Sequence, residues 1–432
     1  MKVLKSVFSR EETPCCLYSR IFNFLRIRHL FLLTFQKNNA IIFLVMIMTD
    51  IKNEINALEE EIINLRRTLH RHPEFAFCEF KTGEIIKDFL KKHNIDYKDG
   101  IAKTGICADI KGAENGKTIL VRADIDALKI TEQNDVEYKS ENNGFMHACG
   151  HDFHIAIALY CAAVIKKIQN EIKGNVRFIF QPAEEETGGA LDMINEGVLK
   201  NVDTAVGLHV DPETETGKIT VKDGEFFASP DFFNAEIIGK GSHGAQPQNA
   251  VDPIKILTEI LFNIHKNVDS ATENKVVMSV CKVNSGFSEN SIPDTASFGG
   301  TVRAFDNVLR KKADKAIEET IKTACEKAGA KYEYKYTYLY PPLINDKNVT
   351  ERLKKSAEKI IGKENILTAE KNMLGDDFSY IAENVPSCYF KLGCRNDAKI
   401  SSNKLHTPNF NPNENAIKIG AEIFVNFILD NL

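Results

Sequence analysis

The sequence predicts an α/β protein with a mostly parallel sheet flanked by helices, and a second unit of different topology inserted into it. Two observations predict this fold class. Between residues 118 and 209, short apolar runs alternate with helical patterns, which is typical of parallel βαβ units. Between residues 230 and 342 the order of elements changes to βαββαβ, which is the ferredoxin-like arrangement.

The first unit begins with two helical patterns. From Thr49 onward apolar residues recur every three or four positions, as on one face of a helix, and Pro73 ends this pattern. A second helix is expected at about residues 81–93. Buried strands are then expected at 118–125, 175–180 and 204–208, and helices at 155–171 and 188–196.

The inserted unit is expected to contain four strands and two helices. The strands are predicted at 232–239, 275–283, 297–305 and 331–340, and the helices at 253–265 and 308–328. Helical patterns and short apolar runs return afterwards and end in a C-terminal helix. We therefore expect one domain made of residues 49–229 and 343–432, and a second made of residues 230–342.

The composition is that of an ordinary soluble globular protein. The 432 residues suffice for two or three domains of about 100–200 residues each. The net charge of −5 and the lack of a long basic block argue against a nucleic-acid partner. Ten cysteines without a CxxC pair indicate free thiols in a reducing compartment, so we expect a cytoplasmic protein without membrane partners.

The first 48 residues do not match the rest of the chain. Their two apolar segments, Phe31–Phe35 and Ile41–Met48, are both shorter than the roughly 20 residues that span a membrane. No small-residue cleavage site follows the longer segment, as a signal peptide would require. We expect residues 1–48 to be a non-native or disordered extension, with Met46 or Met48 as the natural start. A membrane anchor is the alternative.

A dense cluster of possible metal ligands precedes the helix expected at 155–171. His147, Cys149, His151 and His154 fall within eight residues. Such a cluster at the start of a helix favours a metal site or a catalytic thiol. The ordinary alternative is a buried cysteine surrounded by hydrogen-bonded histidines.

Further candidates follow the predicted strands. Glu184 and Glu185 come after the strand at 175–180, His209 ends the next strand, and His406 lies in a Leu-His-Thr-Pro turn. Taken singly, these are an acidic turn, a core histidine and a surface histidine. In open α/β sheets, however, the working site gathers beyond the carboxyl ends of the strands.

Together these donors suit a pair of metal ions. Thiolate, imidazole and carboxylate groups favour zinc or its transition-metal neighbours over magnesium. The candidate ligand set is Cys149, His151, Glu185, His209 and His406. The rival hypothesis, a Cys149 nucleophile with a histidine base, leaves the glutamates without a role. A GxGxxG match at 239–244 is not followed by a helix start, which excludes a dinucleotide fingerprint.

Several segments in this order resemble one known family. The chain from Ile51 to the C-terminus resembles the aminoacylase/carboxypeptidase family of dinuclear metallo-amidohydrolases. The branch is that of hippurate hydrolases, indole-acetyl-amino-acid hydrolases and N-acetyl-diaminopimelate deacetylases. The segments that carry the resemblance are RADIDA at 122–127, MHACGHD at 146–152, QPAEE at 181–185, GLH at 207–209 and GSHGAQP at 241–247.

The resemblance implies roles for individual residues. It implies two divalent transition-metal ions (zinc, manganese, cobalt or nickel) per subunit, held by the five candidate ligands, with Glu184 as general base. Asp126 and His154 are implied to orient ligands. Residues 230–342 are implied to form a lid that often mediates homodimerisation. His243 of this lid would support the tetrahedral intermediate, commonly from the partner subunit.

The resemblance also implies where the substrate binds. Asn290 and Arg303 fall where the family contacts the substrate carboxylate. Two departures from the family pattern, Glu186 before Thr187 and Asp376 before Asp377, could shift substrate preference.

The predicted function is hydrolysis of the amide bond of N-acyl amino acids, with acetyl, benzoyl or similar acyl groups. The attacking water is shared by the two metal ions, and Glu184 accepts its proton. Two alternatives stay open. The same site could serve a dipeptidase or carboxypeptidase, or the chain could be a metal-binding regulatory protein without turnover.

Overall fold

The computed structural model describes residues 53–186, 188–397 and 404–432. The expectations for residues 1–48, including the natural start, lie outside these described residues. From Glu59 to Leu432 the chain forms one compact unit. A helix covers residues 53–71, close to the first predicted helix. In the described part of the chain, no helix is both long enough and apolar enough to cross a bilayer.

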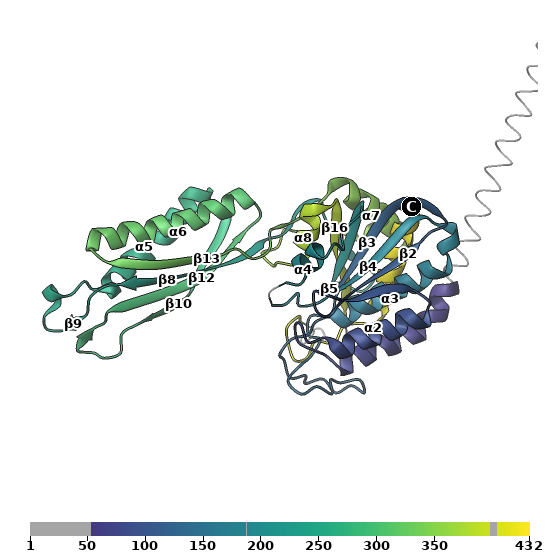
Figure 1. The fold of residues 1–432 in the computed structure, drawn as a ribbon, viewed down its shortest axis with the longest axis horizontal. Coiled ribbons are helices and arrows are strands. Elements are labelled where there is room, and N and C mark those ends of the chain that lie inside the picture. Colours follow the sequence, from purple (N-terminus) through teal and green to yellow (C-terminus); the bar gives the residue numbers. More distant parts are fainter. Residues whose placement is uncertain (1–52, 187, 398–403) are drawn as a thin grey trace, which may run out of the picture. The chain divides into compact units, whose positions relative to one another are not determined.

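An eight-stranded sheet forms the centre of the α/β fold (Figure 1). Its strand order is β1-β2-β4-β3-β5-β16-β6-β15. The strands are β1 (Asp96–Ile101), β2 (Gly105–Lys111), β3 (Glu114–Asp124), β4 (Lys173–Gln181), β5 (Thr204–Glu215), β6 (Ile219–Val221), β15 (Ile366–Thr368) and β16 (Ser387–Arg395).

The sheet is mixed: parallel pairing forms its centre and also joins β15 to β6, and antiparallel pairs, which were not predicted, occur toward both edges. Strands β4, β3, β5 and β16 run parallel at the centre. The pairs β1–β2, β2–β4 and β16–β6 are antiparallel. A turn of three residues, 102–104, joins β1 to β2, and so short a connection permits only antiparallel pairing. The polar segment of β1 offered no apolar run from which to predict it.

Helices cover both faces of this sheet. Helix α3 (His151–Lys167) is buried from His151 to Ile165, as expected for a helix enclosed on all sides. It contacts α9 (Asn415–Asn431), and the Phe424 ring of α9 packs against Phe390 of β16. On the other face, α4 (Ala190–Asn195) and α8 (Phe378–Asn384) pack through Met193 and Phe378. The remaining helices of this part are α2 (Phe80–Lys92) and α7 (Lys347–Ile361).

A separate four-stranded sheet follows the predicted βαββαβ order. It contains β8 (Ser229–Ile238), β10 (Val276–Ser285), β12 (Thr295–Ala304) and β13 (Lys331–Thr337), in the order β10-β12-β8-β13. All of its pairs are antiparallel. Helices α5 (Pro253–Thr272) and α6 (Asn307–Ala328) pack together on this sheet around a core of their own (Figure 1). The boundaries of the two domains stay a prediction.

Local chemistry explains where these two helices begin. The Asp252 carboxylate accepts a hydrogen bond from the Ile254 N–H (2.9 Å), and Pro253 occupies the first turn of α5. Asp306 caps α6 in the same way by accepting from the Val308 N–H (2.6 Å). Each cap satisfies a backbone donor that the helix leaves unpaired.

Candidate active site

The candidate ligands gather at one edge of the eight-stranded sheet. Cys149 and the left-handed Gly150 precede α3, and Glu184 and Glu185 follow β4. Two element bounds differ from the predicted ones. His151 is the first residue of α3, and His209 lies inside β5, because β5 stays paired with β16 as far as Glu215.

Two sets of three donor atoms converge, and Cys149 belongs to both. The Cys149 Sγ lies 3.2 Å from Nε2 of His209 and 3.2 Å from Nε2 of His406. His406 Nε2 lies 3.1 Å from Oε1 of Glu185, and His151 Nε2 lies 3.9 Å from the same oxygen. In each set, Cys149 with His151 and His209 or Cys149 with Glu185 and His406, the donor atoms lie within 4.8 Å of one another.

These residues fit a pair of metal ions. Nε2 of His151 is buried and forms no hydrogen bond within the described chain, although it faces the carboxylates of Asp124 (3.6 Å) and Glu185 (3.9 Å). An unpaired buried polar atom costs about 1–3 kcal/mol, so a cation between these groups would remove a penalty. Soft and borderline donors in this combination suit zinc and its transition-metal neighbours.

The environment of Cys149 argues against its use as a bare nucleophile. Burial, then the charges of Glu185 and Glu184, raise the pKa of the Cys149 thiol well above its ordinary value. A nucleophilic cysteine needs the opposite, a lowered pKa. A bound divalent cation would have the opposite effect on the thiol, because a thiol that coordinates a metal ion is deprotonated.

Asp126 orients two of the candidate ligands. Nδ1 of His151 contacts the main-chain oxygen (2.9 Å) and the carboxylate (3.1 Å) of Asp126, so Nδ1 carries the proton and Nε2 is free for a metal. The second Asp126 oxygen accepts from the backbone N–H of Glu185 (3.0 Å).

His154 is engaged through both ring nitrogens. Its Nε2 accepts from the Val210 N–H (3.0 Å), so its Nδ1 donates to Asp124 (2.5 Å). Both nitrogens are thus occupied by protein groups, and the role of His154 in orienting ligands stays a prediction.

Glu184 is buried beside the ligands and close to a second pair of acids. One carboxylate oxygen each of Glu184, Asp376 and Asp377 lie within 4.8 Å of one another. Burial, followed by the charge of Asp376, raises the pKa of Glu184 well above its ordinary value. The buried Arg122 guanidinium links both sides of the site, since it donates to Asp124 (2.6 Å) and to Asp377 (2.8 Å).

The turn that carries Glu184 and Glu185 is held by a residue that sequence reasoning missed. One oxygen of the buried Glu79 accepts from the Ala183 N–H (3.0 Å), and the other accepts from the Thr104 hydroxyl (2.6 Å). Ala183 is held in the left-handed region, with φ of 58°. The only signal in the sequence is an acid placed shortly before the helix expected at 81–93.

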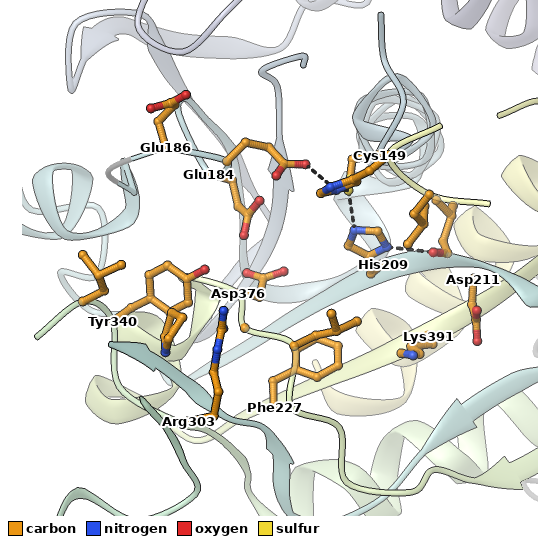
Figure 2. A pocket seen from close by; sticks show the side chains of 18 of the residues that line it. Cys149, Glu184, Glu186, His209, Asp211, Phe227, Arg303, Tyr340, Asp376 and Lys391 are labelled. Atoms are coloured by element: carbon orange, nitrogen blue, oxygen red, sulfur yellow. Dashed lines mark hydrogen bonds and ion pairs between the residues drawn. The ribbon is translucent and has the colours of Figure 1, made fainter. Parts of the chain in front are cut away.

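A cavity of about 500 Å³ opens onto this site. Figure 2 shows Cys149, Glu184 and His209 facing it, together with Arg303 and Lys391. The structure thus brings Arg303 to the same space as the candidate ligands.

The structure does not bring His243 and Asn290 to this cavity. Both are exposed, on β9 (Ser242–His243) and just before β11 (Ser291–Ile292). They lie next to each other, because Ser291 pairs with His243 and the Gly244 N–H donates to the Asn290 carbonyl (2.8 Å). Their roles stay predictions.

Comparison with known proteins identifies the family of this chain. The profile of Peptidase family M20/M25/M40 matches residues 120–430. Thermostable carboxypeptidase 2 of Saccharolobus solfataricus is 35% identical over 86% of this chain and 95% of its own length. The N-acetylcysteine deacetylase of Bacillus subtilis is 37% identical over 85% of this chain and 96% of its own length.

Solved structures give the same result. A putative aminohydrolase from methicillin-resistant Staphylococcus aureus superposes with a TM-score of 0.82 at 31% identity, covering 88% of this chain and 98% of the other. A Bacillus subtilis protein described as a dinuclear metal-binding peptidase of the M20 family superposes with a TM-score of 0.76 at 34% identity, covering 87% of this chain and all of the other. The chain therefore belongs to peptidase family M20/M25/M40 and is a hydrolytic enzyme that acts on amide bonds.

Proposed function

We propose that this enzyme is a metal-dependent amidohydrolase that releases amino acids from N-acyl amino acids with acetyl, benzoyl or similar acyl groups. The observation that carries the proposal is the pair of three-donor sets that share Cys149, beside the buried carboxylate of Glu184. Relatives named as deacetylases and as an N-acyl-L-amino acid amidohydrolase support this substrate class.

The two donor sets would hold two divalent ions such as zinc, manganese, cobalt or nickel. One set is Cys149, His151 and His209, and the other is Cys149, Glu185 and His406. When bound, such ions lower the pKa of a coordinated water and polarise an amide carbonyl.

Glu184 would perform the proton transfers. It accepts a proton from the attacking water and then delivers it to the nitrogen of the leaving amine, a role worth roughly 10²–10⁴-fold in rate. Its backbone is positioned for this task, because Glu79 holds Ala183 on one side and Asp126 holds Glu185 on the other. Arg303, which lines the same cavity, would bind the substrate carboxylate.

Residues 230–342 would act as a ferredoxin-like lid and as the contact between two subunits. His243 and Asn290 are exposed and adjacent, so both can contact the same surface of a partner subunit. We propose that they complete the active site of the partner subunit, with His243 donating to the developing oxyanion.

The second candidate is a dipeptidase or carboxypeptidase that uses the same site. The carboxypeptidase names of two relatives, 35% and 34% identical, favour it. Membership of a hydrolytic family sets aside the third reading, a metal-binding regulatory protein without turnover.

One assay tests these proposals together. The purified enzyme is stripped with a chelator, reloaded with zinc, manganese, cobalt or nickel, and assayed on N-acetyl amino acids, N-benzoyl amino acids and dipeptides. We expect no turnover after stripping, recovery on reloading, and higher kcat/KM for the N-acyl amino acids. Turnover that persists in metal-free enzyme contradicts the metal-dependent mechanism, and a preference for dipeptides establishes the second candidate.

A further inference from the structure

Lys391 brings a positive charge to the wall of the active-site cavity. It lies in β16 between Phe390 and Leu392, which are fully buried against the helices behind the sheet, whereas Lys391 lines the cavity. In the parallel pairing of β16 with β5, Lys391 is the register partner of His209. Register partners project from the same face, so the lysine lies beside a candidate metal ligand.

The Lys391 ammonium has no carboxylate partner in the described part of the chain. None of the ion pairs found there includes it, and its Nζ lies 5.8 Å from the centre of the Phe227 ring. Asp211 lines the same cavity, but its two oxygens accept from the Glu213 N–H (3.2 Å) and the Thr214 hydroxyl (2.8 Å). A half-buried ammonium without a carboxylate is suited to bind an anionic ligand.

The cavity contains a second cation with the same property. Arg303 forms no ion pair within the described residues, whereas the buried Arg122 and Arg310 are both paired with aspartates. Figure 2 shows Arg303 and Lys391 on different sides of the cavity, with Phe227 between them. Two separated cations in one cavity are suited to bind a ligand that has two separated anionic groups.

The positions of the two cations relative to Glu184 assign the anions to parts of the substrate. In Figure 2, Glu184 and Arg303 lie on one side of the cavity, and His209 and Lys391 lie on the other. Glu184 delivers its proton to the leaving amine in the proposed mechanism, so the amino-acid half of the substrate belongs on its side. The acyl half then extends along His209 toward Lys391.

We propose that Lys391 determines specificity by binding a free carboxylate at the far end of the acyl group. The preferred substrates are therefore N-acyl amino acids whose acyl group comes from a dicarboxylic acid, such as N-succinyl or N-glutaryl amino acids. Hydrolysis adds water across the amide bond and yields the free amino acid and the dicarboxylic acid. This inference rests on the proposed amidohydrolase function and goes beyond the acetyl and benzoyl groups named there, because it adds a terminal carboxylate to the preferred acyl group.

The test compares matched substrates on matched variants. The metal-loaded enzyme is assayed on an N-succinyl amino acid and on its succinamoyl analogue, in which a carboxamide replaces the free carboxylate. The variants are Lys391→Met, Lys391→Arg and the control Lys173→Met, which removes an equal charge at the start of β4, the opposite end of the strands. The wild type and the control should prefer the acid by about 10- to 100-fold in kcat/KM.

The inference predicts that Lys391→Met abolishes this preference and that Lys391→Arg retains part of it. An equal loss on both substrates would indicate a structural role and overturn the inference. So would a wild-type enzyme without the preference. A third arm compares kcat/KM for N-acetyl-glutamate and N-acetyl-glutamine. If the wild type prefers the glutamate and Lys391→Met does not, Lys391 binds a carboxylate of the amino-acid half. That result would overturn the assignment to the acyl group.

A binding measurement separates this inference from the proposed function. Calorimetric binding of the N-succinyl amino acid and of its carboxamide analogue is measured on the inactive Glu184→Gln enzyme with and without Lys391→Met. If no N-acyl amino acid is hydrolysed by the wild type, the proposed function fails. A Lys391-dependent difference in Kd still supports the carboxylate site, and equal Kd values for the two ligands would refute it.

Discussion

The edge of the eight-stranded sheet and the exposed loops of the four-stranded region hold their candidate functional residues in opposite ways. At the edge, His151 and Glu185 are each fixed by buried Asp126, and the turn before Glu185 is fixed by Glu79. In the loops, His243 and Asn290 are exposed, and the His243 ring accepts only a local hydrogen bond, from the Ala245 N–H (3.1 Å).

The difference indicates that the two regions have different roles. A preorganised site keeps its groups in place before the substrate arrives, and its supporting contacts reduce the cost of ordering them. His243 and Asn290 are exposed and lack buried charged partners of this kind within the described residues. In the proposed mechanism, the edge of the large sheet would therefore provide the metal-binding and proton-transfer groups, and the loops would provide groups that must be brought to it.

The largest effect is expected from Glu184→Gln, which removes the base but keeps the shape of the preorganised site. We expect kcat to fall by roughly 10²–10⁴-fold while the metal content stays at two ions per subunit. Steady-state kinetics and elemental analysis of the same preparation measure both. The control is Glu213→Gln, an exposed acid of β5. A Glu184→Gln enzyme with near wild-type kcat would remove Glu184 as the base.

The next effect sharpens the comparison by testing the exposed loops. His243→Ala should lower kcat by about 10²–10³-fold, as expected on loss of one oxyanion donor. His265→Ala, an exposed histidine of α5 in the same region, is the matched control and should have no effect.

Mixed subunits decide whether His243 acts across a dimer. If it does, an exchanged equimolar mixture of Glu184→Gln and His243→Ala subunits regains about a quarter of wild-type activity, because half of the dimers contain one complete site of two. If His243 serves its own subunit, no site in the mixture is complete and no activity returns.

A smaller effect tests whether the edge is preorganised by its supporting residues. Asp126→Asn weakens the hold on the Nδ1 proton of His151, and such changes cost about 10–100-fold in metal affinity. Competition with a chromophoric chelator measures this affinity. Unchanged affinity would show that the metal ions, and not Asp126, fix the orientation of His151.

The sequence predicts local motifs well and long-range contacts poorly, and both kinds of feature form the edge of the large sheet. That the candidate ligands gather at one edge was predictable, because most of their motifs follow a strand or open a helix, and parallel strands bring such ends together. Glu79 was missed because it contacts Ala183 from 104 positions away in the chain. The sequence shows Arg122 only as part of a motif, because its partner Asp377 lies 255 residues further on. Periodicity describes local structure, and these contacts depend on tertiary packing.

The smallest effect is expected from a change confined to the four-stranded region. Asp306→Ala removes the cap of α6 and should reduce the free energy of unfolding by about 1 kcal/mol. The conservative Asp306→Asn retains an accepting oxygen and should restore most of this loss. Denaturant titration measures the free energy of unfolding. The metal content of the same variants reports separately whether the site on the eight-stranded sheet is intact. If Asp306→Ala also released metal, the two regions would unfold as one cooperative unit, and the difference in their roles would not extend to their stability.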